Sequence, residues 1–444
     1  MKKLILSLFT LTLSLTALGQ QAGDNFVIKT SEAGKTTEWS LAGDSKNGDI
    51  STIKHKGNQL ILYAKGYEGT EWETYDIDKI ESITFNVFHK GSYVEESAAQ
   101  AVKNMGIGTN FGNCTDVVAM WMNMNSNSVT DFEKAWGQEP TTKPMVDFLK
   151  KNGFNSVRIP VTWFQHMKAD GTVDEAWMNR IQEIVDYVID NGMYCILNIH
   201  HDTGADSDDV KHWIKADEAN YKENKEKFEY LWTQIATRFK NYDQHLVFEG
   251  YNEMLDADNT WNAPKSASSY KGLNGYAQSF VNAVRATGGN NETRNLIVNT
   301  YAAANGDEVL NNLTIPTDKV DGHIAVEVHT YAPWDWFAQK GKWDASCSND
   351  IKNMFTRLNK KFISKGIPCI IGEYGTHGSK SVSKNSSASE IQAAADQAAD
   401  IVKQAKAYGV ATFYWMSIFD GTDRSVPQWT LPTVVEAMKK AYNE

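Results

Sequence analysis

The sequence predicts an α/β protein in which a (β/α)8 TIM barrel, residues 97–444, follows a small all-β module, residues 24–96. After about residue 98, apolar runs alternate with amphipathic helical stretches, which is typical of a parallel sheet with crossover helices. Eight such units are present, the number that closes a TIM barrel. A doubly wound open sheet is the alternative, but no Gly-rich dinucleotide loop follows the first apolar run.

The first 19 residues have the three regions of a secretory signal peptide, residues 1–19. Met1-Lys2-Lys3 supplies the positive charge, residues 4–18 form the apolar run, and the small residues Ala17 and Gly19 mark the cleavage site. We therefore expect a secreted, periplasmic or cell-surface protein. No later stretch approaches about 18 uninterrupted apolar residues, so we expect no membrane insertion.

The overall composition excludes several classes of partner. The formal net charge of -11 and the pI of about 5.5 argue against nucleic acid or an anionic membrane surface. Aromatic residues make up 11% of the chain, enough to build a core and also line a cleft. The four cysteines form no CxxC pair, so neither a disulfide framework nor a zinc knuckle is predicted, although one bridge remains open in an exported protein.

The residues before the barrel read as short antiparallel strands. Apolar runs at 26–28, 59–63 and 82–87 are separated by Gly and by charged turns. Tyr63, Tyr67, Trp72 or Tyr75 could bind polysaccharide, and the module could equally be a spacer or a docking element. We favour a packing role for these aromatic residues, because in a small β module they commonly form the core.

The eight predicted barrel strands are residues 106–111, 156–163, 194–202, 246–253, 295–301, 323–331, 369–373 and 412–417. Between them, apolar residues recur at spacings of three and four, as in Met178-Ile181-Ile184-Val185-Val188 and Phe228-Leu231-Trp232-Ile235-Phe239. Glycines follow the predicted helix ends, where a left-handed residue often terminates a helix, at positions 153, 192, 288, 366 and 409.

Two predicted strands end in a glutamate. Glu253 closes the fourth apolar run and Glu373 closes the seventh. A carboxylate at a buried strand end is costly unless it is paired or used in chemistry, so each is either a structural ion-pair member or a catalytic group. TIM barrel active sites lie at the carboxyl ends of the strands, where this chain also places Asn110, Arg158, His200, His201, Asn252, His329, Tyr331 and Trp415.

These residues resemble glycoside hydrolase family 5, the cellulase family of the large retaining barrel clan. The resemblance covers about residue 103 to the carboxyl terminus. The residues that carry it are Gly108 to Asn113, Trp136-Gly137, Thr141-Thr142-Lys143, Val157 to Trp163, Leu197 to His201, Asn252-Glu253, His329-Thr330-Tyr331, Ile371 to Gly375 and Tyr414-Trp415. Met254 stands where the family usually has proline.

The resemblance implies that Glu253 is the catalytic acid/base and Glu373 the nucleophile. A retaining glycosidase requires two carboxyl groups about 5 Å apart, one to attack the anomeric carbon and one to protonate the leaving oxygen. The implied activity is that of a secreted endo-β-1,4-glucanase, acting on a polysaccharide by double displacement without a metal or other cofactor. A xyloglucanase or a β-mannanase of the same fold remains open, and we expect a monomer.

The resemblance also implies a set of substrate-binding residues around the two glutamates. Asn252 would bind the sugar 2-hydroxyl, Arg158 would lie near Glu373 and hold it ionised, and Tyr331 would hydrogen-bond Glu373. The histidines and Trp415 would line the subsite of the reacting sugar, and Trp334 and Trp336 would offer a neighbouring platform. The complete predicted set is Asn110, Arg158, His200, His201, Asn252, His329, Tyr331, Trp334, Trp336 and Trp415.

Two other classes of function are alternatives to the glucanase that the resemblance implies. A metal hydrolase could use His200, His201, Asp202 and His329, but successive residues of a strand point to opposite faces, which is poor geometry for chelation, and the two glutamates would then have no role. A catalytically silent carbohydrate-binding barrel would require a blocked cleft, because both carboxylates are present.

Overall fold

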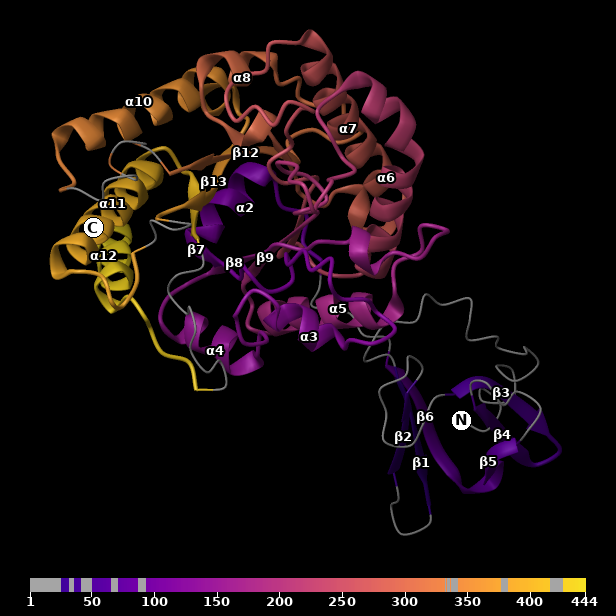
Figure 1. The fold of residues 1–444 in the computed structure, drawn as a ribbon. Helices are drawn as coiled ribbons and strands as arrows, with labels where there is room; N and C mark the ends of the chain where they lie inside the picture. The colour runs from indigo at the N-terminus through magenta and orange to yellow at the C-terminus, as the bar shows by residue number, and fades with distance from the viewer. Residues whose placement is uncertain are drawn as a thin grey trace. The chain divides into compact units, whose positions relative to one another are not determined.

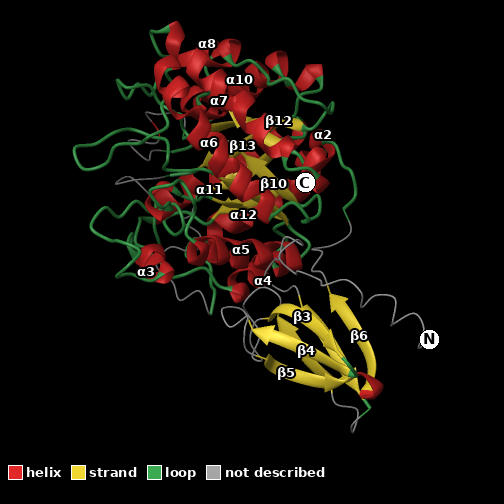
Figure 2. Cartoon of the chain, turned by 90° about the vertical axis from the view of Figure 1, so that its right-hand side faces the viewer, coloured by secondary structure: helices red, strands yellow, loops and turns green. Residues whose placement is uncertain are grey.

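The computed structural model describes residues 25–31, 36–40, 50–64, 71–86, 93–331, 333, 336, 342–376, 382–415 and 426–444. The predicted signal peptide (residues 1–19), Tyr67 and Trp334 lie outside the described residues. The chain divides into two compact units, residues 1–90 and residues 91–444. Figures 1 and 2 show the strands of the first unit and the helix-covered barrel of the second.

The first unit contains two three-stranded antiparallel sheets, ordered β2-β1-β6 and β3-β4-β5. The strands are β1 (Asn25–Thr30), β2 (Thr36–Ser40), β3 (Ile50–Lys56), β4 (Gln59–Ala64), β5 (Glu71–Asp76) and β6 (Ile80–Asn86). Ile28, Leu60 and Leu62 form the core, so both sheets contribute to it, and Tyr75 packs against it. The antiparallel strands predicted for this region are confirmed, and Tyr75 has the packing role that we favoured.

The second unit is a closed barrel of eight parallel strands, ordered β10-β11-β12-β13-β14-β7-β8-β9. The strands are β7 (Ile107–Asn110), β8 (Ser156–Ile159), β9 (Tyr194–Asn198), β10 (Leu246–Glu249), β11 (Leu296–Asn299), β12 (Ile324–Thr330), β13 (Cys369–Tyr374) and β14 (Ala411–Tyr414). Each predicted strand forms one of them, so the predicted TIM barrel is confirmed. Glu253 lies in the loop after β10, because the strand is four residues shorter than predicted.

Helices cover the outside of the barrel (Figure 1). The α-helices are α2 (Ala98–Met105), α3 (Val129–Lys134), α4 (Lys143–Lys151), α5 (Glu175–Asp190), α6 (Glu218–Arg238), α7 (Ala267–Ala286), α8 (Asp307–Asn312), α10 (Ala345–Lys361), α11 (Ala388–Ala407) and α12 (Pro432–Asn443). Short 3-10 turns occur at Ile77–Lys79, Phe164–His166, Gly289–Glu292, Tyr301–Ala303 and Ile363–Lys365.

Helix α5 shows how the sequence defines one of these elements. Asp174 caps its start by accepting hydrogen bonds from the backbone N–H groups of Ala176 and Trp177. The apolar stripe predicted from Met178 to Val188 is buried, which fixes the face that the helix turns to the barrel. Gly192 follows the helix with φ of 60°, a conformation that favours glycine.

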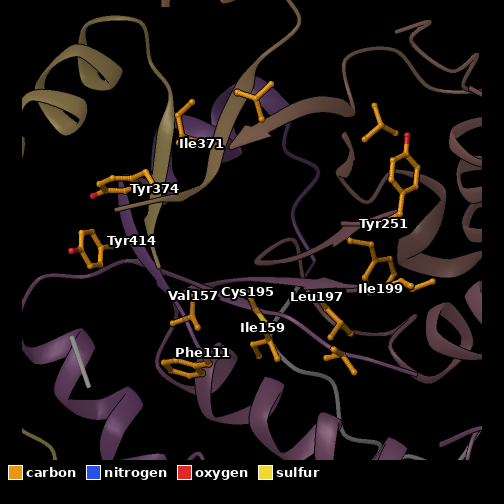
Figure 3. Close-up of a cluster of buried hydrophobic side chains, with 14 of the residues drawn as sticks. Phe111, Val157, Ile159, Cys195, Leu197, Ile199, Tyr251, Ile371, Tyr374 and Tyr414 are labelled. Atoms are coloured by element: carbon orange, nitrogen blue, oxygen red, sulfur yellow. The ribbon is translucent and has the colours of Figure 1, made fainter. Parts of the chain in front are cut away.

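The core of the barrel has an outer and an inner part. Outward-facing strand residues pack against the helices, and Figure 3 shows several of them, including Val157, Ile159, Leu197 and Ile371. Inside the barrel, strand residues of the opposite parity form a second cluster that is completed by Ala98, Ala101, Val102 and Met105 of α2. Helix α2 lies at the amino ends of the strands, since Ala98 N–H donates to Gly322 just before β12 and Ser156 Oγ donates to Met105 just before β7.

The interior changes from apolar to polar along the strands. Ile196, Val247 and Ala325 belong to the apolar inner cluster. Two residues further along the same strands, where side chains again point inward, stand Asn198, Glu249 and Glu327, all fully buried. The polar end of the barrel interior is therefore its carboxyl end. Across the described residues, no helix has the length and the apolar character needed to cross a membrane.

Candidate active site

Arg158 on β8 is the centre of the polar layer. Its side chain is fully buried, and each of its five N–H groups has a partner. Nε and one Nη donate to the two carboxylate oxygens of Glu249 at 2.7 and 2.8 Å. The remaining bonds go to Glu373 Oε1 at 2.9 Å, Asn252 Oδ1 at 2.8 Å and Asn110 Oδ1 at 2.9 Å. Arg158 therefore lies beside Glu373, as predicted, and its five N–H groups are all taken up by protein acceptors, which favours a positioning role over direct binding of substrate.

Asn110 also supports the site from beneath. Its side chain is 2% exposed, and its amide nitrogen donates to the carbonyl oxygen of Gly372 at 2.9 Å while its oxygen receives Arg158. Both ends of the amide are thus occupied by protein groups. The structure places Asn110 between β13 and Arg158, which favours a supporting role over the predicted contact with substrate.

The two predicted catalytic carboxylates face the same space. One carboxylate oxygen of Glu253, one carboxylate oxygen of Glu373 and one ring nitrogen of His329 lie within 4.8 Å of one another. The side chain of Glu253 is 19% exposed and that of Glu373 is 6% exposed. Carboxyl groups separated by about 5 Å fit a retaining glycosidase, whereas inverting enzymes require about 6.5–9.5 Å to admit a water molecule.

Glu373 on β13 is held by donors on both of its oxygens. Arg158 donates to Oε1 at 2.9 Å, and the Tyr331 hydroxyl donates to Oε2 at 2.7 Å. Burial raises the pKa of Glu373 to about 7, while the positive charges of His329 and Arg158 and the hydrogen bond from Tyr331 act to lower that pKa. The fixed orientation and the two donors suit a carboxylate that attacks as a nucleophile.

Glu253 contacts His329 of β12. Nδ1 of His329 lies 2.8 Å from Glu253 Oε1, and Nε2 lies 3.1 Å from Glu327 Oε1. Burial opposes the charged imidazolium, but the carboxylates of Glu373, Glu253 and Glu327 outweigh burial and raise the pKa of His329 to about 10. The imidazole thus lies between two carboxyl groups and is a source of positive charge beside both catalytic residues.

Asn252 is oriented by Arg158. Because its Oδ1 accepts from the guanidinium, the amide NH2 is the group left to bind a ligand. The backbone N–H of Asn252 donates to Ile199 after β9, which holds this loop on the barrel. An amide donor beside the acid/base residue fits the predicted contact with a sugar 2-hydroxyl.

His200, His201 and Trp415 lie at the same rim. His200 Nε2 is 3.9 Å from Glu373 Oε1, and its ring lies parallel to that of Trp415 at 5.8 Å. Burial, together with nearby positive charge, lowers the pKa of His200 well below its usual value, so the ring is neutral. His201 is 27% exposed, 3.8 Å from Asp116 Oδ2 and 5.5 Å from the Trp136 ring. The structure thus brings the histidines, Trp415 and both glutamates together.

Of the two residues predicted to form an aromatic platform in the loop after β12, the structure describes Trp336 only. Trp334 lies outside the described residues. Trp336 is 5% exposed, and its ring packs edge-on against Trp343 at 4.9 Å. A ring that is buried in this way presents no face to a sugar, so Trp336 is a packing residue here.

The four residues of the metal-hydrolase hypothesis do not form one cluster. Asp202 has its two oxygens occupied by the Trp163 backbone N–H at 2.7 Å and the Trp213 indole N–H at 2.6 Å. His200 and His201 were expected to point to opposite faces of a strand, and this was wrong. β9 ends at Asn198, before both residues, and their ring centres lie 4.5 Å apart in an edge-on contact. All four cysteines are buried and free, so the bridge left open by the sequence is not formed.

Sequence reasoning missed two buried acids of the site, Glu249 and Glu327. Glu249 accepts two of the five Arg158 hydrogen bonds and one from Asn198 Nδ2, and Glu327 contacts Arg158 and His329. A signal was present in the alternation of the strands. Glu327 stands two residues before His329 on β12 and therefore faces the same interior, while Glu249 shares the parity of Glu253 only in the longer strand that the sequence predicted.

Known proteins share this sequence and architecture. Residues 114–421 match the family described as cellulase, glycosyl hydrolase family 5. The cellulase/esterase CelE of Acetivibrio thermocellus is 34% identical over 365 residues, which are 78% of this chain but only 40% of CelE. A GH5-4 broad specificity endoglucanase from an uncultured bacterium is 43% identical, with a TM-score of 0.72 over 81% of this chain and 98% of that one.

The similarity to one solved enzyme is higher. The crystal structure of PbGH5A, a glycoside hydrolase family 5 enzyme from Prevotella bryantii B14, is 58% identical, with a TM-score of 0.76 over 80% of this chain and 100% of that chain. A variant of PbGH5A has been solved in complex with the xyloglucan tetradecasaccharide XXXGXXXG. The matched region contains both predicted catalytic carboxylates and most of the barrel. The chain therefore belongs to glycoside hydrolase family 5, the cellulase family.

Proposed function

We propose that this chain is an endo-β-1,4-glucanase that hydrolyses β-glucan polysaccharides with retention of anomeric configuration. The observation that carries the proposal is the approach of Glu253 and Glu373, with His329, to within 4.8 Å at the carboxyl end of the barrel. Family membership supports the reaction class, and the endoglucanase names of several relatives support the substrate class.

The geometry supports one role for each carboxyl group. Glu373 attacks the anomeric carbon while Glu253 gives its proton to the glycosidic oxygen, so the carbon–oxygen bond breaks and a glycosyl ester forms on Glu373. A water molecule then attacks the same carbon, Glu253 takes its proton, and Glu373 leaves as a carboxylate. Glu373 is the nucleophile because two donors fix both of its oxygens, and Glu253 is the acid/base because it is the more exposed of the two.

Branched glucans are a second class of substrate within this proposal. The complex of a 58% identical relative with a xyloglucan oligosaccharide supports activity on xyloglucan as well as on linear glucans. A panel of carboxymethylcellulose, lichenan, xyloglucan and mannan separates these substrates by release of reducing ends. A rapid fall in viscosity at low reducing-end release identifies endo cleavage, and NMR of the first-formed anomer identifies retention.

We further propose that the chain is exported after removal of residues 1–19 and acts as a monomer. The charged, apolar and small-residue regions at the start of the sequence support export. All residues of the proposed site come from one chain, which supports activity without a partner subunit. Amino-terminal sequencing of the mature protein, with Gln20 expected first, and light scattering test these two points.

A further inference from the structure

Glu327 is a buried carboxylate of the site that takes no direct part in the proposed bond changes. It lies on β12, two residues before His329, and its side chain is fully buried. Its Oε1 is 3.1 Å from Nε2 of His329 and 3.3 Å from Nε of Arg158. Glu327 therefore contacts the imidazole on the side opposite Glu253, and it does not border the space in which a sugar would react.

The neighbouring strand leaves room for this carboxylate. Gly372 precedes Glu373 on β13, and a Cβ added to Gly372 would fall 1.7 Å from Glu327 Oε1 and 2.2 Å from its carboxyl carbon. No side chain larger than hydrogen can occupy position 372 unless Glu327 moves. The strand that presents the nucleophile thus has a gap that the Glu327 carboxylate fills.

The contacts of His329 determine where its protons lie. Glu327 forms an ion pair with Arg158 at 3.3 Å, and a carboxylate in such a pair accepts hydrogen bonds, so the nitrogen of His329 that faces it carries a hydrogen. Nδ1 then faces Glu253 Oε1 at 2.8 Å. One further proton can lie either on Nδ1 of His329 or on the carboxyl group of Glu253. Either the imidazolium donates to an ionised Glu253, or a neutral imidazole accepts from a protonated Glu253.

We propose that Glu327 is a positioning residue that holds the Nε2–H form of His329 and thereby makes Nδ1 the proton partner of Glu253. The proposal rests on the acid/base role proposed above for Glu253 and deepens it. In the first step the shared proton passes from Glu253 to the leaving oxygen, which leaves an ionised Glu253 and a neutral His329. In the second step Glu253 takes a proton from the attacking water, which restores the shared proton.

The charged groups around His329 set the expected effect of pH. Glu253 faces it from the loop after β10, Glu373 from β13 at 3.6 Å, and Glu327 from its own strand. Arg158 of β8 binds both Glu327 and Glu373, and the neutral His200 follows β9. The carboxylates of Glu253, Glu373 and Glu327 all favour a proton on His329. Loss of the Glu327 charge therefore means that the proton shared by His329 and Glu253 is lost at a lower pH.

The test compares Glu327→Gln with the matched variant Glu249→Gln. Glu249 is also buried against Arg158, but its described hydrogen bonds and ion pairs do not include His329.

The measurement is kcat/KM against pH on lichenan and on an aryl β-cellobioside with an activated leaving group. In Glu327→Gln the basic limb on lichenan should move down by about one pH unit or more, while the rate on the activated substrate falls much less. Glu249→Gln should leave the basic limb in place. If kcat/KM of Glu327→Gln is lower than that of the wild type by the same factor at every pH, so that the basic limb does not move, the proposal is overturned.

A second measurement does not depend on the folding of Glu327→Gln. In the wild-type protein labelled with 15N-histidine, NMR should show a hydrogen on Nε2 of His329 between pH 6 and 8, with the signal assigned by its loss in His329→Gln. A bare Nε2 overturns the proposal. If wild-type protein hydrolyses none of the glucans, the proposed function fails, but the NMR result still decides the protonation of His329.

Discussion

At the scale of single residues, replacement of the nucleophile has the largest expected effect. Glu373→Gln keeps the shape of the side chain but removes the charge that attacks the anomeric carbon. We expect kcat on lichenan to fall by about 10³-fold or more, with binding of a cello-oligosaccharide preserved. Steady-state kinetics and calorimetry measure the two effects. Glu139→Gln, a change of an exposed glutamate, is the matched control, and an unchanged rate in Glu373→Gln would remove Glu373 from the mechanism.

Glu253→Ala should separate the two chemical steps. Without the acid, natural glucans lose most of their turnover, because the glycosidic oxygen leaves unprotonated. Aryl cellobiosides with activated leaving groups need no acid, so the variant should still form the glycosyl ester on Glu373. Mass spectrometry of the intact protein detects this intermediate, and its absence in both the wild type and the variant contradicts double displacement.

Tyr331 should determine part of the pH profile. Its hydroxyl donates to Glu373 Oε2 and favours the ionised form, which burial opposes by raising the pKa of Glu373 to about 7. Removal of that donor in Tyr331→Phe raises the pKa of Glu373 further, so the nucleophile becomes protonated at a higher pH. The acid limb of kcat/KM should therefore move upward, with a larger loss of activity at pH 6 than at pH 8. A limb that stays in place contradicts the assignment.

The two proposed catalytic residues are easier to recognise in the sequence than the groups that contact them. Glu253 and Glu373 are recognisable because each follows an apolar run. Glu249 and Glu327 lie within such runs, where a single acid looks like an interruption. The contact of Arg158 with Glu373 was expected, but its bonds to Glu249 and Asn110 and the bond of Asn110 to Gly372 join strands distant in sequence, and no local pattern reports them.

At the scale of elements, β13 depends on a glycine. Gly372→Ala places a methyl group against the Glu327 carboxylate, and overpacking of this kind costs about 1–3 kcal/mol. We expect a lower midpoint of thermal unfolding and lower activity, because the strand also carries Glu373. Gly306→Ala is the control, since nothing lies within 4 Å of its added Cβ. If the clash is the cause, Gly372→Ala and Glu327→Ser together should cost less than the sum of the two changes.

The predicted strands were found, but several of their ends were placed too late. The second strand was expected at 156–163, and β8 ends at Ile159. Pro160 follows and has no N–H to donate to a strand ladder, while Val161 and Trp163 are fully buried in the loop. Hydrophobicity identifies burial, so it cannot separate the last strand residues from a buried loop.

At the scale of the whole molecule, each compact unit has its own core. Leu60→Ala should destabilise the small unit by about 2–5 kcal/mol, since Leu60 is fully buried in a core of few residues. We expect kcat on soluble lichenan to be unchanged, because every residue of the proposed site lies between 91 and 444. Calorimetry and kinetics on one sample test this. Val426→Ala, at a position that is 71% exposed, should change neither property.

Arg158 also links the catalytic chemistry to the last stage of folding. Its guanidinium contacts groups that follow or lie on four other strands, β7, β10, β12 and β13, and the acceptors are up to 215 residues away in the chain. During refolding, helices can form from local sequence before those partners arrive. Recovery of enzymatic activity should therefore lag behind recovery of the circular dichroism signal, because an arginine that still lacks some of its carboxylates cannot hold the nucleophile in place.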